Sequence, residues 1–474
     1  MYSDSPVSAV PLELIQEIFL RHRNLFHEPL HAVPAVSKDS RSINFVPGYG
    51  WIAVSHVCRR WRAAAICCPP LWTQLSVTRS AEWTSEVLAR SCGMPLRVTA
   101  SLGLNSGEKV DALRTVLTDL VRIQSLQLSG HVDAEVVALL SNPAPSLEHL
   151  ILDHITLPTP ADPNLKHSDD ALINFPYFLH HDLTPRLTHL ELDAFQPRLR
   201  GPCTSALKHV VFRHRAAGTL LGRPYTSPCL HRVLAALQHM PALESLAFER
   251  EAHAVLDLAA EAELAGDLPD VVLPRLRALR IHATAEECVA FLDCATLPAL
   301  EKFTLTCARS STEYPPTLAP ALARTAQALP ATHALSISRF TGSGFHRYMR
   351  FTGRAPASAS AVPFGGPTFD VMLDRGYGRE NVIPLLAGCL PLQSVRELQV
   401  ESRAEPEEAA WRTVLGAMPN LESVAVVGQL ARQRLPELHA CVEAVLGAEE
   451  ARKEASARRR IPEVSCCSSK SGYA

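Results

Sequence analysis

The chain has 474 residues, of which 47% are hydrophobic and 20% charged, a balance typical of folded proteins rather than disordered ones. This length favours two to four domains, or a small domain followed by a repeat array. The formal net charge of -2 counts against a large nucleic-acid interface, which would require an excess of basic residues.

Membrane and secretion signals are not expected either. Uncharged runs such as Asn381 to Val395 are short and contain Pro384 and Pro391, so no membrane span is predicted. Asp4 lies where a signal peptide would be basic. The 13 cysteines are odd in number and irregularly spaced, which favours free thiols in the cytoplasm or nucleus.

The first predicted helix runs from Pro11 to Leu20, with the proline near the helix start, where its missing N–H is not needed. The apolar arc of this helix is wider than one core contact requires, which indicates contact with both its own core and a partner. Its apolar positions form two sets on adjoining faces: Leu12, Ile15 and Phe19, and Leu14 and Ile18.

A second helix is predicted from Trp51 to Ala65 and ends before Pro69-Pro70, after which Leu71-Trp72 adds apolar bulk. Between the two helices, residues 23–50 form an insertion rich in proline and glycine, which we expect to be a loop. The spacing of five residues predicts one shared helix face: Val54, Val57, Cys58, Trp61 and Ala65.

The residues of this N-terminal part resemble a known family. Val10-Pro11-Leu12-Glu13-Leu14-Ile15 followed by Glu17-Ile18-Phe19 is similar to the opening of F-box domains. Val54 to Arg62 resembles the second half of the motif, and Pro70-Leu71-Trp72 resembles its end. The segments Val87 to Ser91 and Pro95 to Val98 are similar to the first repeat of F-box proteins abundant in mushroom-forming fungi.

The resemblance implies a three-helix F-box-like module over residues 7–77 that binds a Skp-type adaptor and, through it, a cullin. The insertion at 23–50 departs from the family pattern. By match to the motif, the residues expected to contact the adaptor or to border that contact are Pro11, Leu12, Ile15, Ile18, Phe19, Val57, Cys58 and Trp61.

The middle of the chain repeats an apolar phrase, Leu-x-x-Leu-x-Leu or a near equivalent. The last two apolar positions are two residues apart, so they share one face of a short strand, and stacked copies would form a parallel sheet. Copies begin at Ile123, Leu147, Leu187, Leu207, Leu243, Leu276, Leu300, Val395 and Leu421, with a weaker copy at Leu335 and Ile337.

Helix-like segments lie between the copies, at Val110 to Leu120, Arg232 to Met240 and Glu286 to Cys294. A proline often precedes the phrase, as at Pro145 and Pro241, and is expected to mark the boundary between helix and strand. This order predicts an α/β fold: an irregular, degenerate leucine-rich-repeat solenoid over residues 78–447, with parallel short strands and helices on the outer face.

The spacing between copies is uneven, so large insertions are expected at Pro158 to Pro185 and Thr341 to Asn381. Residues 448–474 are mostly polar, with Arg458, Arg459 and Arg460 in a row, and are predicted to be a disordered tail.

Catalytic and metal-binding motifs are weak. His27-Glu28-Pro29-Leu30-His31 fits the zinc motif HExxH in letters, but Pro29 breaks the helix that this chemistry requires. His180-His181-Asp182 and Cys67-Cys68 favour a solvent-exposed loop and buried thiols, respectively. The prediction is a non-catalytic protein without metal or cofactor.

Three interpretations follow. The first is a substrate receptor of a Skp–cullin–F-box ubiquitin ligase, with the repeats binding an unidentified substrate protein. The second is a repeat scaffold whose F-box-like segment only caps the solenoid. The third is an enzyme whose insertions build a pocket, for which the sequence offers no converging set of ionisable residues.

Overall fold

The structure is a computed structural model of the whole chain. It describes residues 10–24, 49–103, 107–156, 183–193, 205–214, 230–250, 268–308, 314–341, 347–356, 367–374, 382–401, 408–427 and 463–467. The chain forms two compact units, residues 1–207 and 208–474. Both are mixed α/β, and most of their strand pairs are parallel, as the sequence predicts.

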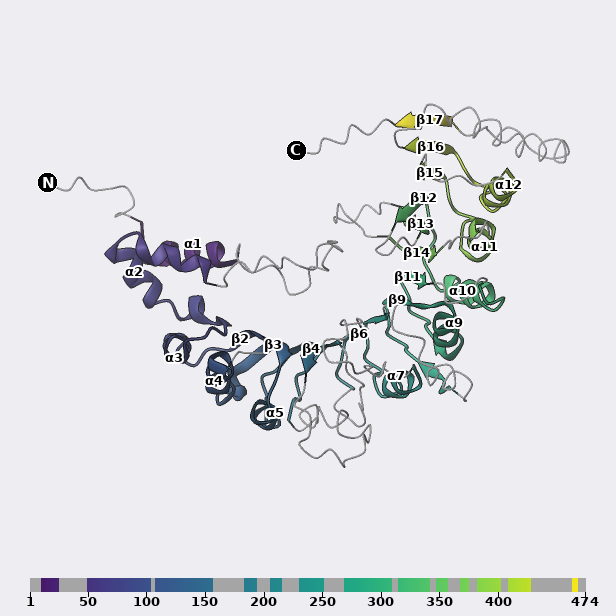
Figure 1. Cartoon of the computed structure of the whole chain (residues 1–474). Helices are drawn as coiled ribbons and strands as arrows, with labels where there is room; N and C mark the ends of the chain where they lie inside the picture. Colours follow the sequence, from purple (N-terminus) through teal and green to yellow (C-terminus); the bar gives the residue numbers. More distant parts are fainter. Residues whose placement is uncertain are drawn as a thin grey trace. The chain divides into compact units, whose positions relative to one another are not determined.

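The first unit begins with helices and continues as a sheet. Its elements are α1 (Leu12–Asn24), η2 (Gly50–His56), α2 (Arg59–Ile66), η3 (Pro69–Trp72), β1 (Gln74–Ser76), α3 (Ala81–Arg90), β2 (Leu96–Leu102), α4 (Gly107–Leu117), η4 (Leu120–Arg122), β3 (Ile123–His131), α5 (Ala134–Leu140), β4 (His149–Thr156) and β5 (His189–Asp193). The five strands pair in parallel in chain order. Helices α3, α4 and α5 pack side by side along one side of the sheet (Figure 1).

The second unit continues the alternation of strand and helix. Its elements are β6 (His209–His214), α7 (Leu230–Leu237), β7 (Ser245–Arg250), β8 (Val271–Val272), β9 (Ala278–Thr284), α9 (Ala285–Cys294), β10 (Ala295–Thr296), β11 (Lys302–Ala308), α10 (Leu318–Ala326), β12 (Ala334–Thr341), β13 (Arg347–Arg354), β14 (Phe369–Asp374), α11 (Val382–Cys389), β15 (Glu397–Glu401), α12 (Glu408–Gly416), β16 (Ser423–Val427) and β17 (Glu463–Cys467).

Parallel register sets equivalent positions of the apolar phrase side by side. In the first unit, Leu126 of β3 pairs with Leu150 of β4, which pairs with Leu190 of β5. The second unit contains two such columns: Val210, Leu246, Leu279, Phe303 and Phe369; and Leu335, Leu398 and Val424. All of these side chains are buried. The predicted strands and their parallel pairing are therefore confirmed.

The step from helix to strand uses one recurring turn. The N–H of Leu147 donates to the carbonyl of Ala144 (3.0 Å), and the N–H of Leu243 donates to that of Met240 (3.2 Å). In both turns the proline follows the acceptor directly, after the helix has ended. The predicted boundary role of proline is confirmed at these two positions, because proline cannot continue the helix.

The predicted insertion from Thr341 to Asn381 is wrong in part. Its residues include β13 and β14, which enter the sheet between β11 and β12, with β13 antiparallel to both of its neighbours. Gly353 of β13 pairs with Phe369 of β14, and a Cβ at Gly353 would collide with the Phe369 ring. The close packing of β13 on the Phe369 ring therefore requires glycine at position 353.

Two other predictions need correction. Residues 74–76 lie in the segment predicted to be helical but form β1, which pairs with β2. Residues 463–467 lie in the tail predicted to be disordered but form β17, which pairs with β16. The predicted insertion 158–185 lies outside the described residues except for 183–185.

Candidate partner-binding surface of the N-terminal helices

Polar side chains on α1 form hydrogen bonds with the helices that follow it. The Gln16 Nε2 donates to the carbonyls of Ala64 (3.3 Å) and Cys67 (3.2 Å) at the end of α2. The last carbonyls of a helix have no partner within it, so Gln16 satisfies two acceptors there. Arg23 is buried and donates to the carbonyl of Pro70 in η3, and burial lowers the pKa of Arg23.

One stripe of α1 forms the core of these helices. Ile15 is 2% exposed and Phe19 0% exposed. The Phe19 ring meets Trp61 of α2 edge to face, with 5.2 Å between ring centroids. Aromatic pairs in this geometry add about 0.5–1.5 kcal/mol beyond the burial of their area. This stripe therefore holds α1 against α2.

A second stripe of α1 remains uncovered. Leu14 is 56% exposed and Ile18 is 54% exposed. The two lie four residues apart, which places them one above the other on one helix face. Leu12, near the helix start, is 41% exposed. A helix that leaves a pair of large aliphatic side chains in solvent presents a ready contact for a partner.

The start of α2 adds to this surface. Val57 is 61% exposed and lies two positions before Arg59, the first residue of α2. The guanidinium of Arg60 donates to the carbonyl of Val10, which ties the segment carrying Val57 to the start of α1. Arg59 and Arg62, which follow Val57 in the sequence, are exposed as well, so the exposed part of this segment also carries positive charge.

The structure divides the residues that the sequence predicts as adaptor contacts. Exposed are Pro11, Leu12, Ile18, Val57 and Cys58; half-buried is Trp61; buried are Ile15 and Phe19. Ile15 and Phe19 are core residues of the N-terminal helices, and their contact with a partner stays a prediction. Leu14 was missing from the predicted set, although its spacing from Ile18 was the signal that could have identified it.

The predicted helix from Trp51 to Ala65 is also wrong as one element. It is divided into η2 and α2, and Cys58 lies between them, where its Sγ accepts the Trp61 N–H at 3.5 Å. The break changes the helical phase, so Val54 and Ala65 are buried while Val57 is exposed. These residues therefore do not share one face.

A cluster of aromatic side chains joins the N-terminal helices to the first strand–helix pair. The Trp72 ring lies 5.1 Å from that of Trp51 and 6.0 Å from that of Trp83 on α3. The guanidinium of Arg90, also on α3, lies 4.4 Å from the Trp72 ring centroid, within the range of a cation–π contact. The N-terminal helices thus pack on the β1 end of this sheet, and this packing leaves the Leu14 and Ile18 stripe exposed.

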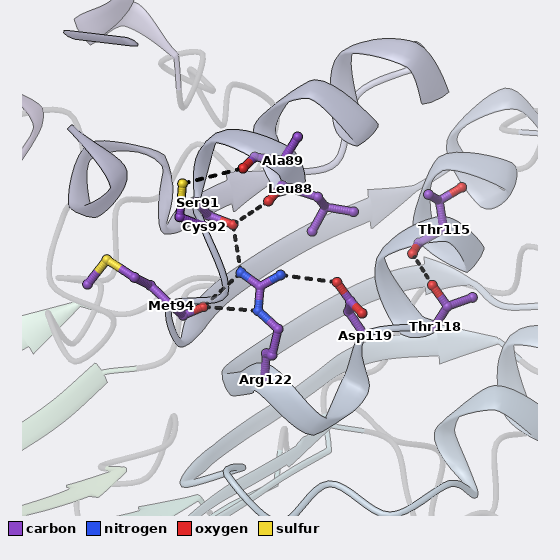
Figure 2. A network of polar contacts seen from close by, with 9 residues as sticks. All are labelled: Leu88, Ala89, Ser91, Cys92, Met94, Thr115, Thr118, Asp119 and Arg122. Carbon is purple, nitrogen blue, oxygen red and sulfur yellow. Dashed lines mark hydrogen bonds and ion pairs between the residues drawn. The ribbon is translucent and has the colours of Figure 1, made fainter. Parts of the chain in front are cut away.

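The turn after α3 is held by one arginine (Figure 2). Cys92 and Gly93 have φ values of 47° and 76° in this turn, and the positive φ at Cys92 is strained because cysteine carries a Cβ. Arg122 donates to the carbonyl of Met94 at 3.0 Å and to the Ser91 Oγ at 2.7 Å. The guanidinium therefore fixes the turn that leads into β2.

The sheet face opposite the buried phrase residues is polar in the second unit. The Arg213 Nε lies 3.3 Å from the Glu249 Oε2, and the Arg280 Nη1 lies 3.5 Å from the Glu249 Oε1. Further along, Arg350 and Asp370 form a two-pronged pair at 2.7 and 2.5 Å. This face of the sheet therefore carries pairs of opposite charges rather than a surface of uniformly positive or negative charge.

Other predicted chemistry falls largely outside the described residues. The HExxH-like segment 27–31 and the run 180–182 lie there. Among the residues that the structure describes, no three metal-binding side chains converge, and no helix is long and apolar enough to cross a membrane. The eight cysteines between Cys58 and Cys389 whose side chains the structure describes form no disulfide. Cys68 is buried, but Cys67 is exposed, which corrects the prediction for this pair.

No family model matches the chain, and no curated protein matches it. The geometry of the described residues, and above all the two stripes of α1, is therefore the basis for a functional proposal.

Proposed function

We propose that the chain is a substrate receptor of a Skp–cullin–F-box ubiquitin ligase. The N-terminal helices are an F-box-like module that binds a Skp-type adaptor, and the strands and helices that follow are irregular leucine-rich repeats that hold a substrate protein. The observation that carries the proposal is the exposed stripe of Leu14 and Ile18 on α1. The other stripe of this helix, Ile15 and Phe19, is buried inside the module.

The burial pattern supports contact with a protein surface. Full burial of a leucine or isoleucine side chain contributes about 1.5–3 kcal/mol, and about half of each side chain is still available in Leu14 and Ile18. Arg59 and Arg62, which follow Val57 in the sequence, are exposed, so they favour a partner that carries acidic groups near its groove. An exposed apolar helix stripe fits helix-in-groove recognition.

The alternative is a repeat scaffold in which the module only caps the sheet. The contacts of Trp72 with Trp83 favour a capping role, since they cover the β1 end of the first unit. Capping and adaptor binding use different sides of the module, so the two functions are compatible. Only adaptor binding requires Leu14 and Ile18 to be apolar.

The test is co-purification of the full chain with a Skp-type adaptor from the same organism. Leu14→Asp with Ile18→Asp should weaken binding at least about 100-fold, because each charge in an apolar groove costs more than about 1.4 kcal/mol. The matched control is Val121→Asp with Val272→Asp, whose parent side chains are 57% and 61% exposed and lie outside the module. This control should bind like the parent chain.

Circular dichroism and thermal unfolding should be the same for both double variants. Equal binding by the two variants would favour the capping alternative, as would no binding by either the folded parent chain or a folded chain with a shortened insertion. A chain in which residues 25–48 are replaced by a short Gly/Ser linker tests whether the insertion between the two halves blocks the adaptor. Binding only by this shortened chain would assign the obstruction to the insertion.

A further inference from the structure

The C-terminal segment contains a copy of the apolar phrase that the sequence analysis missed. Ile461, Val464 and Cys466 have the same spacing as the earlier copies. In the structure, β17 runs parallel to β16, with Val464 in register with Val424 and Cys466 in register with Val426 (Figure 1). The segment therefore adds one strand to two columns of apolar positions, one through Leu398 and Val424 and one through Val400 and Val426.

β17 covers one edge of β16. The other edge of β16 is paired with β15, and the Val424 and Val426 side chains are 0% and 2% exposed. Without β17, one row of β16 backbone N–H and C=O groups would lack strand partners, and such an edge readily pairs with another extended chain. In the structure, β17 supplies hydrogen-bond partners for these backbone groups of β16.

The segment carries less apolar bulk than the copies before it. Its two strand positions are Val464 and Cys466, whereas the corresponding positions of β7 and β11 are leucine and phenylalanine. Smaller apolar side chains contribute less free energy to strand pairing, so β17 should be held less tightly than β7 and β11. A weakly held terminal strand exchanges with competitors more readily than a central one.

We propose that the edge of β16 is a docking site for one extended peptide, that residues 463–467 of the same chain are its resident occupant, and that they are held reversibly. The same edge would accept in trans a peptide that runs parallel to β16 and has an apolar-x-x-apolar-x-apolar pattern. Backbone hydrogen bonds would give affinity and the two columns would select the alternating side chains. This proposal does not depend on adaptor binding.

Hydrogen–deuterium exchange of residues 423–427 tests the proposal, with the full chain compared to a chain that ends at Arg460. Truncation should speed exchange of these amides at least tenfold and leave β6, β7 and β9 unchanged. A synthetic peptide of residues 461–469, added under reducing conditions at increasing concentration, should restore protection. Val464→Asp in the full chain should resemble truncation, and Ser465→Asp, at the alternate register position, should resemble the parent.

Three results would overturn the proposal. Equal exchange of residues 423–427 in the full and truncated chains would mean that the segment does not cover this edge. Loss of protection throughout residues 208–427 would make the segment an integral part of the fold rather than a reversible occupant. A full chain that is dimeric by light scattering and becomes monomeric on truncation would assign the segment to a second copy.

Discussion

The division of α1 into a core stripe and a free stripe predicts opposite stability effects for two neighbouring residues. Phe19→Ala removes a fully buried ring that packs edge to face on Trp61. Truncations of this kind cost about 3–5 kcal/mol, through lost transfer free energy and the cavity left behind. Ile18→Ala removes a side chain that is 54% exposed, and surface changes of this kind usually stay within about 0.5 kcal/mol.

Urea denaturation followed by tryptophan fluorescence is well suited to this comparison. Of the five tryptophans, only Trp411 lies outside residues 51–83, so Trp411→Phe makes the signal report on the N-terminal helices and the first strands. For a slope of about 2 kcal/mol per M urea, a loss of about 4 kcal/mol lowers the midpoint by about 2 M. The midpoint for Ile18→Ala should move by less than about 0.3 M.

Two results would refute this reasoning. Equal midpoint shifts for Phe19→Ala and Ile18→Ala would mean that the helix does not face its core with the Ile15 and Phe19 stripe. A larger shift for Ile18→Ala would mean that the helix is rotated about its axis, with Leu14 and Ile18 inside. The second result would also remove the basis for the proposed adaptor surface.

Three further predictions test the contacts behind the fold. Gly353→Ala should destabilise the second unit by about 1–3 kcal/mol in denaturant, because the new methyl group overlaps the Phe369 ring; an unchanged midpoint would contradict this packing. Arg122→Ala should lower the midpoint of the first unit by the equivalent of about 1–3 kcal/mol, since the Met94 carbonyl loses its charged donor; thermal unfolding of Arg122→Lys should show only partial recovery. Burial raises the pKa of Tyr49 to about 12, so the stability from this group is complete below pH 10, the usual tyrosine value, and is lost as the pH rises toward 12. Stability measured across this range should fall less in Tyr49→Phe than in the parent chain.

The strands were predictable because their signal is repeated. One Leu-x-x-Leu-x-Leu segment is weak evidence, but parallel stacking requires each copy to fill the same column, and that requirement repeats the pattern along the chain. Leu126, Leu150 and Leu190 lie in one column for this reason. The turn before each strand was predictable from proline for a local reason, since proline ends a helix wherever the fold places it.

The strands β13 and β14 were missed because they break the repeated order. Met349 and Phe351 on β13, like Phe369 and Val371 on β14, alternate with period two and are buried. Neither strand is preceded by the Leu-x-x segment with which the other copies begin. In addition, β13 is antiparallel to its neighbours. Alternation alone predicts a strand but not its position in a sheet, so the pairing depended on contacts distant in sequence.

The candidate surface shows a different limit of prediction. The 3.6-residue period assigned Leu14 and Ile18 to one stripe and Ile15 and Phe19 to the next, but both stripes are equally apolar in sequence. Which stripe enters the core depends on the position of α2. That position depends on the break between His56, where η2 ends, and Arg59, where α2 starts, because the helix phase changes there. A short break of this kind leaves little trace in hydrophobic spacing.

The same packing explains why a stable module can retain an apolar stripe. Ile15 and Phe19 already form the apolar contact with α2. Gln16 binds a backbone carbonyl of α2, and Arg23 binds a backbone carbonyl of η3. Polar side chains at positions 14 and 18 would leave these contacts intact, so folding alone does not require them to be apolar. Substitutions at these two positions therefore separate binding from stability, whereas substitutions at Ile15 or Phe19 would change both together.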